Sequence, residues 1–151
     1  MIKRIEDKTE KIQIARMILE QLPEWFGIPE SRENYITGSA NQVFLAAYHH
    51  DTTVGFLCLE KTGRDTLELY VMGILKEYHR KGYGTAIVDA AKEIGKADGF
   101  SFLQIKTVQM GRYEQYDATN RFYLSCGFKE FEVFPDLWDK NNPCQVYVMS
   151  L

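Results

Sequence analysis

The chain contains 151 residues, of which 45% are hydrophobic and 26% are charged, and its formal net charge is −3. This length fits one compact α/β or α+β domain, because each half of a divided chain would bury too little apolar surface for a stable core. The acidic balance argues against nucleic acid as a partner. The cysteines are odd in number and far apart, so they indicate neither a disulfide framework nor a Cys-x-x-Cys metal site: Cys58, Cys126 and Cys144.

Membrane and export signals do not stand out in the sequence. No apolar run approaches the roughly 18 residues that cross a bilayer. The first residues, Met-Ile-Lys-Arg-Ile-Glu, lack the apolar segment of a secretory leader. We therefore expect a cytoplasmic protein that has no membrane partner.

The first half of the chain is predicted to hold one helix and an antiparallel three-stranded meander. Residues 2–6 form a short strand, and apolar residues recur at helical spacing over residues 9–22, where Pro23 ends the helix. Residues 25–29 are predicted to form an ordered aromatic loop. The meander strands cover residues 43–48, 54–61 and 67–75.

A turn is predicted at residues 49–53, between the first two strands of the meander, and it contains His49 and His50. Adjacent imidazoles in such a turn are solvated far more often than they bind a metal, and no third ligand stands nearby at useful spacing. We therefore predict no metal site.

The second half of the chain alternates helices and strands. The apolar positions after residue 84 suit a helix packed on a sheet, and this helix ends near residue 97. Residues 100–107 form a buried strand and residues 117–125 a short helix. A closing β-hairpin is predicted from residues 128–134 and 144–149.

A glycine-rich turn joins the third meander strand to the following helix. Such a turn points backbone N–H groups outward, with the positive end of the helix dipole behind them, and this arrangement binds phosphate. Gly82 and Gly84 permit close backbone approach, while Arg80 and Lys81 add positive charge. Neither NAD nor ATP is favoured, because Ile87 replaces the third glycine of the dinucleotide motif and no Gly-Lys-Ser/Thr occurs.

This turn resembles the acyl-CoA pyrophosphate motif of the GNAT superfamily of N-acetyltransferases, Gln/Arg-x-x-Gly-x-Gly/Ala. Gly82 and Gly84 stand at its two small positions, and His79 replaces the Gln or Arg. About forty residues later, residues 122–128 read Phe-Tyr-x-x-x-Gly-Phe and resemble the second GNAT signature, with Gly127 suited to cap a helix. On these two motifs the chain is identified as a member of the GNAT superfamily. The segments at residues 22–29 and 132–144 resemble those of an uncharacterised bacterial GNAT subgroup.

The resemblance implies a mixed α/β fold, a single domain over residues 1–151 with a largely antiparallel, splayed sheet flanked by helices. It also implies acetyl-CoA as cosubstrate and no metal. Backbone amides of the glycine turn would hold the pyrophosphate, and those of the preceding strand the pantetheine arm. The residues expected to bind CoA are Met72, Ile74, His79, Arg80, Lys81, Gly82, Tyr83, Gly84, Thr85 and Tyr123.

The family chemistry assigns three catalytic roles. Tyr123 matches the tyrosine that protonates the departing thiolate, and Glu68 aligns with the glutamate that serves as base in histone-type relatives. The Met72 amide would stabilise the developing oxyanion. The family's Asn-x-x-Ala is replaced by Tyr116 and Thr119, so no family role is transferred to Asn120.

The acceptor is expected to be a small-molecule or peptide amine, and four aromatic residues could wall its pocket or pack in the core: Trp25, Phe26, Tyr35 and Trp138. A homodimer is common in the family, and the sequence leaves the oligomeric state open. Two other functions remain open, a non-catalytic acyl-CoA-binding sensor and a nucleotide-binding regulator.

Overall fold

A computed structural model describes residues 1–151 and shows seven β-strands and four α-helices. The chain divides into two compact units. The first unit comprises Met1–Glu60 and Leu69–Ile94, and the second comprises Lys61–Glu68 and Gly95–Leu151. Each unit is described by itself.

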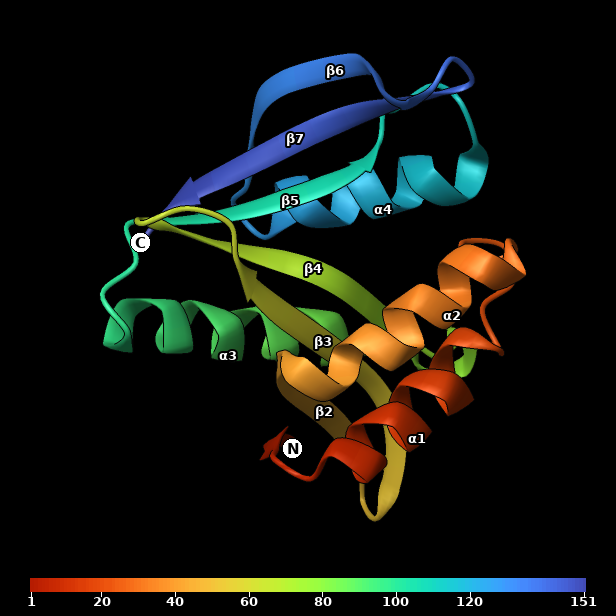
Figure 1. Cartoon of the computed structure of the whole chain (residues 1–151), viewed down its shortest axis with the longest axis vertical. Helices are drawn as coiled ribbons and strands as arrows, with labels where there is room; N and C mark the ends of the chain where they lie inside the picture. The colour runs from red at the N-terminus through yellow and green to blue at the C-terminus, as the bar shows by residue number, and fades with distance from the viewer. The chain divides into compact units, whose positions relative to one another are not determined.

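The first unit contains strands of one half of the sheet and three helices (Figure 1). The neighbouring strands follow the order β1, β2, β3, β4, and β1 to β3 are antiparallel. Asp7 caps the first helix by accepting a hydrogen bond from the Glu10 N–H at 2.8 Å. The elements are β1 (Ile2–Ile5), α1 (Lys8–Leu19), α2 (Pro29–Gly38), β2 (Val43–His49), β3 (Thr52–Lys61), β4 (Thr66–Ile74) and α3 (Tyr83–Ala97).

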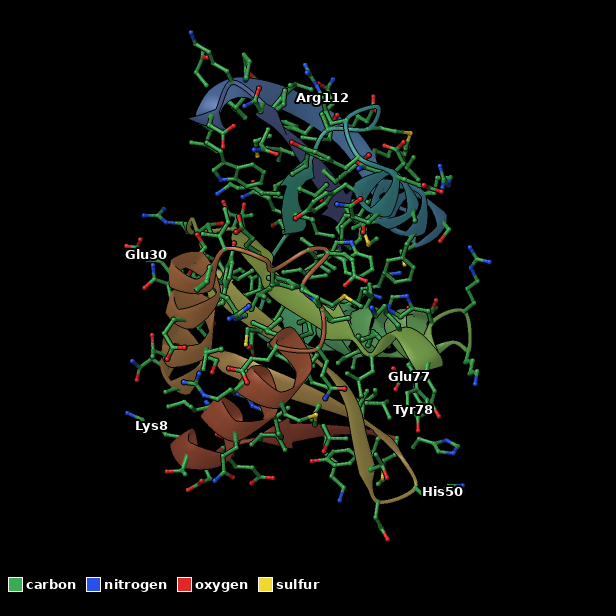
Figure 2. All side chains as sticks on the ribbon, turned by 90° about the vertical axis from the view of Figure 1, so that its right-hand side faces the viewer. Lys8, Glu30, His50, Glu77, Tyr78 and Arg112 are labelled. Carbon is green, nitrogen blue, oxygen red and sulfur yellow. The ribbon has the colours of Figure 1, made fainter.

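Both faces of the first unit's sheet are covered by helices. Figures 1 and 2 show α1 and α2 on one face and α3 across the sheet from them. Phe44 and Ala46 of β2 belong to the buried cluster with α1, while their neighbours Leu45 and Ala47 point to the opposite face and are also buried. This two-sided burial explains why β2 and β3 read as nearly continuous apolar runs.

The second unit packs one helix on a four-strand arrangement. Its elements are β5 (Phe102–Val108), α4 (Glu114–Ser125), β6 (Lys129–Asp139) and β7 (Asn142–Ser150), with the first residues of β4. Thr66–Glu68 of β4 pair in parallel with residues 102–104 of β5, and β5, β7 and β6 are antiparallel neighbours. The sheet is therefore largely antiparallel, as predicted.

The predicted strands and three predicted helices are present with shifted ends, and one helix was missed. Helix α2 starts at the last residue of the predicted loop and continues over residues 30–38, for which no element was predicted. Helix α1 ends at Leu19 rather than at residue 22. The turn between β2 and β3 is shorter than predicted, because His49 pairs with Thr52. Close packing explains why a glycine, Gly73, stands within strand β4. A Cβ at this position would lie 3.0 Å from side-chain atoms of both Ile18 and Leu22.

Candidate functional site

The glycine turn lies in the first unit, between β4 and α3. Gly82 adopts φ 91° and Arg80 φ 60°, so the chain passes through left-handed backbone conformations before the helix starts. The first helical hydrogen bond runs from the Ala86 N–H to the Gly82 carbonyl at 3.0 Å. The N–H groups of residues 83–85 therefore lack partners within the helix.

The space around this turn suits a phosphate group. A Cβ at Gly82 would meet no atom within 4 Å, and Arg80 and Lys81 are exposed beside it. The N-terminal end of a 15-residue helix adds a partial positive charge at the same place. The residues present thus fit a pyrophosphate.

His79, at the position that departs from the family motif, binds the protein itself. Its Nε2 lies 2.6 Å from the Ile74 carbonyl oxygen, and because a carbonyl can only accept, Nε2 carries the proton. The ring also meets Trp25 edge-on at 5.9 Å between centroids. His79 therefore links the end of β4 to the start of the glycine turn.

His49 is exposed, as predicted, and it also contacts the start of α3. Its Nδ1 lies 2.6 Å from the hydroxyl of Tyr83, the first residue of α3. Its ring also contacts Tyr78 at 5.5 Å between centroids. Figure 2 shows the neighbouring His50 at the tip of the β2–β3 hairpin. The hairpin thus supports the residue that follows the glycine turn.

Three of the predicted acceptor-wall residues lie in the first unit. Phe26 meets Tyr35 edge-on at 5.9 Å, and Tyr35 meets Tyr70 of β4 at 5.6 Å between ring centroids. Tyr70 keeps 40% of its surface exposed within a strand that is otherwise mostly buried. Trp138 belongs to β6 in the second unit.

Acidic side chains near these rings are held by cations. Lys76 Nζ lies 2.5 Å from Glu24 Oε2, and Arg16 binds both carboxylate oxygens of Glu33 at 2.6 and 2.8 Å. The Lys76 hydrogen bond lowers the pKa of Glu24, and the Arg16 hydrogen bond lowers the pKa of Glu33. Their charges are thus largely matched within the protein.

Tyr123, the predicted acid, lies in the last turn of α4. The helix ends in a Schellman motif: the Gly127 N–H donates to the Leu124 carbonyl at 3.0 Å, and the Phe128 N–H donates to the Tyr123 carbonyl at 3.2 Å. Gly127 adopts φ 100°, as predicted for a capping glycine. Burial by surrounding protein atoms raises the pKa of the Tyr123 phenol well above its usual value.

Asn120 has a structural role that the sequence did not reveal. Its side chain is fully buried and donates from Nδ2 to the carbonyls of Val108 at 2.9 Å and Tyr116 at 2.7 Å. Its Oδ1 accepts a hydrogen bond from the Tyr147 hydroxyl at 2.5 Å. The one signal in the sequence was the position of Asn120, three residues before Tyr123 in the same predicted helix. Its hydrogen bonds fix the helix that carries Tyr123.

Glu68, the predicted base, is buried and paired. Gln104 Nε2 donates to Glu68 Oε1 at 2.7 Å, and Lys106 Nζ lies 3.2 Å from the same oxygen. The Glu68 side chain retains 5% of its exposure. Glu68 is therefore not an exposed strand glutamate, and its partners on β5 were not predicted.

The predicted site residues fall into two sets. The first unit holds Met72, Ile74 and the glycine turn, and the second unit holds Glu68 and Tyr123. No group of three His, Cys, Asp or Glu side chains is arranged to hold a metal ion. None of the helices is both long and apolar enough to span a bilayer.

Comparison with known sequences identifies the family. The profile of the acetyltransferase (GNAT) domain matches residues 40–130, more than half of the chain. The chain belongs to the GNAT acetyltransferase family. An uncharacterised N-acetyltransferase of Bacillus licheniformis is 30% identical to this GNAT chain over 106 residues, which make up 58% of this chain and 67% of the relative.

Solved structures share the fold of this GNAT protein. A protein assigned to the GNAT family from Desulfovibrio desulfuricans has TM-score 0.82 at 19% identity, covering 99% of this chain and 98% of its own. An IAA acetyltransferase from Bacillus cereus has TM-score 0.75 at 19% identity, covering 100% and 99%. A Bacillus subtilis acetyltransferase in complex with CoA has TM-score 0.71 at 18% identity, covering 99% and 97%. These likenesses confirm the predicted mixed α/β GNAT fold.

Proposed function

We propose that this protein transfers the acetyl group of acetyl-CoA to a primary amine, by direct attack of the amine in a ternary complex. The observation that carries the proposal is the left-handed glycine turn before α3, in a chain of the GNAT family. The Bacillus subtilis neighbour bound to CoA supports the choice of cosubstrate. The family profile includes residues of both units, which supports one catalytic domain over the whole chain.

Backbone groups of the first unit are proposed to bind the cosubstrate. The N–H groups of Tyr83, Gly84 and Thr85, with the charges of Arg80 and Lys81, would bind the pyrophosphate. Backbone groups of β4 would bind the pantetheine arm: Met72 and Ile74. The carbonyl of Ile74 already accepts from His79, but a carbonyl oxygen has a second lone pair.

Three groups are proposed to carry the chemistry. Acetyl-CoA supplies an activated thioester. The Glu68 carboxylate accepts a proton from the attacking nitrogen, and the Met72 N–H stabilises negative charge on the thioester oxygen as the C–N bond forms. When the C–S bond breaks, the Tyr123 hydroxyl donates its proton to the sulfur. Its raised pKa keeps this phenol protonated through the neutral range.

The aromatic residues of the first unit are proposed to contact the acceptor. Trp25, Phe26 and Tyr35 are partly buried, and each touches another aromatic ring, so they form rigid apolar surfaces. This surface favours an amine with an apolar portion. A small molecule and a peptide both meet that description, and Trp138 of the second unit is kept as a weaker candidate contact.

Ligand binding is tested first by thermal unfolding with acetyl-CoA, CoA, ATP and NAD side by side. A ligand bound only by the native state stabilises it by about 2.7 kcal/mol at a hundred times its Kd. We expect stabilisation by acetyl-CoA and CoA alone. A larger effect of ATP or NAD would favour the nucleotide-binding regulator and contradict the proposal.

Catalysis is tested by thiol release from acetyl-CoA with 2-phenylethylamine, spermidine and a lysine-containing peptide. Tyr123→Phe should lower turnover by roughly 100-fold or more, because it removes the proton donor, while the stabilisation by CoA remains. Tyr113→Phe makes the same change at the exposed N-cap of α4 and should retain turnover. Binding of CoA without thiol release in any arm would favour the sensor.

A further inference from the structure

We propose that Lys106 and Gln104 are positioning residues for Glu68: they anchor one oxygen of its carboxylate, Lys106 compensates the buried charge, and the other oxygen is left to accept the proton of the amine. This inference rests on the proposed acetyl transfer. It adds residues of β5, a strand that contains neither of the two family motifs.

The pairing of β4 with β5 brings these three side chains together. Glu68 stands opposite Gln104 in the parallel register, and alternate residues of β5 share a face, so Lys106 projects to the same side as Gln104. Both donors reach one atom, Glu68 Oε1, at 2.7 Å from Gln104 Nε2 and 3.2 Å from Lys106 Nζ. The carboxylate is thereby oriented, and Oε2 is the oxygen available to a water molecule or an amine.

Burial explains why a cation is needed here. The Glu68 side chain is 5% exposed, and an ionised carboxylate without a partner is costly to bury. A protonated Glu68 could not take a proton from the amine. The Lys106 ammonium compensates the buried charge, while its own 35% exposure keeps it partly hydrated. Lys106 therefore offsets the cost of burying a carboxylate at this position.

Three other ionisable groups lie on the same face of the sheet as this pair. Burial raises the pKa of the Cys144 thiol on β7 to about 11, with a smaller lowering by Lys106 and a smaller raising by Glu68, so the thiol is neutral near pH 7. Glu132 of β6 stands opposite Val146, which stands opposite Lys106, so Glu132 shares the face two strands away, at about 10 Å. Lys129 of β6 stands opposite Val148, which stands opposite Gln104, so it also shares this face, two strands from Gln104. Lys106 is the cation in contact with Glu68.

The kinetic test follows kcat/KM against pH with the fastest amine of the thiol-release panel. Lys106→Met should move the acid limb of the profile to higher pH by roughly one unit or more, because a neighbouring cation favours the ionised carboxylate. Lys106→Arg keeps the positive charge and should keep the acid limb at its wild-type pH. Lys129→Met removes an exposed lysine on the same face, three strands from Glu68, and should leave the acid limb in place. An unmoved limb in Lys106→Met, or an equal loss at every pH, would overturn the inference.

Two further variants separate charge from orientation. Lys106→Gln can keep a donor toward Oε1 without the charge, so it should move the limb, and it serves if Lys106→Met folds poorly. Gln104→Leu keeps the charge and removes one anchor, so it should lower kcat with little change in KM or in the limb. If both variants leave the limb and kcat as in the wild type, the positioning roles are wrong.

A readout that does not need turnover is the carbon-13 NMR titration of glutamate side-chain carboxyl carbons, with the Glu68 signal assigned by its loss in Glu68→Gln. The titration midpoint should lie higher in Lys106→Met than in the wild type and in Lys129→Met. Equal midpoints in Lys106→Met and the wild type overturn this inference and leave the proposed acetyl transfer intact. If Glu68→Gln instead turns over amines at the wild-type rate with an unchanged profile, the base assignment of the proposed function fails.

Discussion

At the scale of single residues, Asn120 shows how a fully buried polar side chain can organise its surroundings. Its three hydrogen bonds join α4 to the end of β5 and to β7, through Val108 and Tyr147. A buried amide that satisfies both its donors and its acceptor specifies one packing of the helix, since any other packing leaves polar groups unpaired. This network fixes the element that carries Tyr123.

A double-mutant cycle tests this network. Asn120→Ala leaves the Tyr147 hydroxyl buried without its acceptor, and we expect a loss of about 1–3 kcal/mol for each stranded polar group. Tyr147→Phe should cost less, because it strands only the Asn120 oxygen. The double variant should lose less than the sum, with a coupling of about 0.5–3 kcal/mol measured by urea unfolding. Additive losses would show that the two side chains stabilise the unit independently.

At the scale of elements, the sequence predicted those whose burial follows a simple period. The apolar positions Ile87, Val88 and Ala91 are fully buried, and they marked α3. Helix α2 was missed because it buries only Ile36 and has no apolar stripe. Its start is set locally by a proline in the first turn, and its position by the bidentate contact of Arg16 with Glu33, which joins residues 17 apart in sequence.

The residues of the candidate site likewise fall into those that the sequence predicted and those that it did not. The glycine turn could be predicted because its chemistry lies in consecutive backbone groups and in two glycines, Gly82 and Gly84. The partners of Glu68 could not be predicted, since Gln104 is 36 residues away and its contact depends on the register of β4 against β5. A site built from consecutive residues can thus be predicted from the sequence, whereas a charge pair between two strands can be identified only when the strand register is known.

Two glycines offer a matched test of element packing in the first unit. A Cβ at Gly55 in β3 would lie 2.8 Å from the Gly73 carbonyl oxygen, so Gly55→Ala should destabilise by about 1–3 kcal/mol. Gly38 has helical backbone angles and open space around its Cβ position, so Gly38→Ala should stabilise by up to about 1 kcal/mol. The urea unfolding midpoints of both variants, compared with that of the wild type, test these two predictions. A neutral Gly55→Ala would mean that β3 and β4 can move apart.

At the scale of the whole molecule, buried acids with raised pKa values occur in both units. Burial is the largest cause for the thiols of Cys58 and Cys144 and for the phenol of Tyr123. Each is an acid whose neutral form the native state favours. In the unfolded chain these groups lose their protons at lower pH, so the native state binds more protons in alkaline solution.

The sign of this linkage predicts alkaline destabilisation. Below the unfolded pKa of the thiols, near 8.5, both states are protonated and the contribution to the free energy of unfolding is constant. Between that value and the native pKa of Cys144, about 11, stability should fall with rising pH, by at most about 1.4 kcal/mol per unit for one group. Urea unfolding from pH 7.5 to 10.5 measures the slope.

Cys144→Ala should make this slope shallower, because it removes one titrating group from the second unit. Val108→Ala is the matched control, since Val108 stands opposite Cys144 in the β5–β7 register and is also buried. It should lower stability at every pH and retain the wild-type slope. If Cys144→Ala also retains that slope, the thiol does not titrate with unfolding, and the alkaline loss comes from other groups, such as Cys58, Tyr123 and Tyr147, whose pKa values burial also raises.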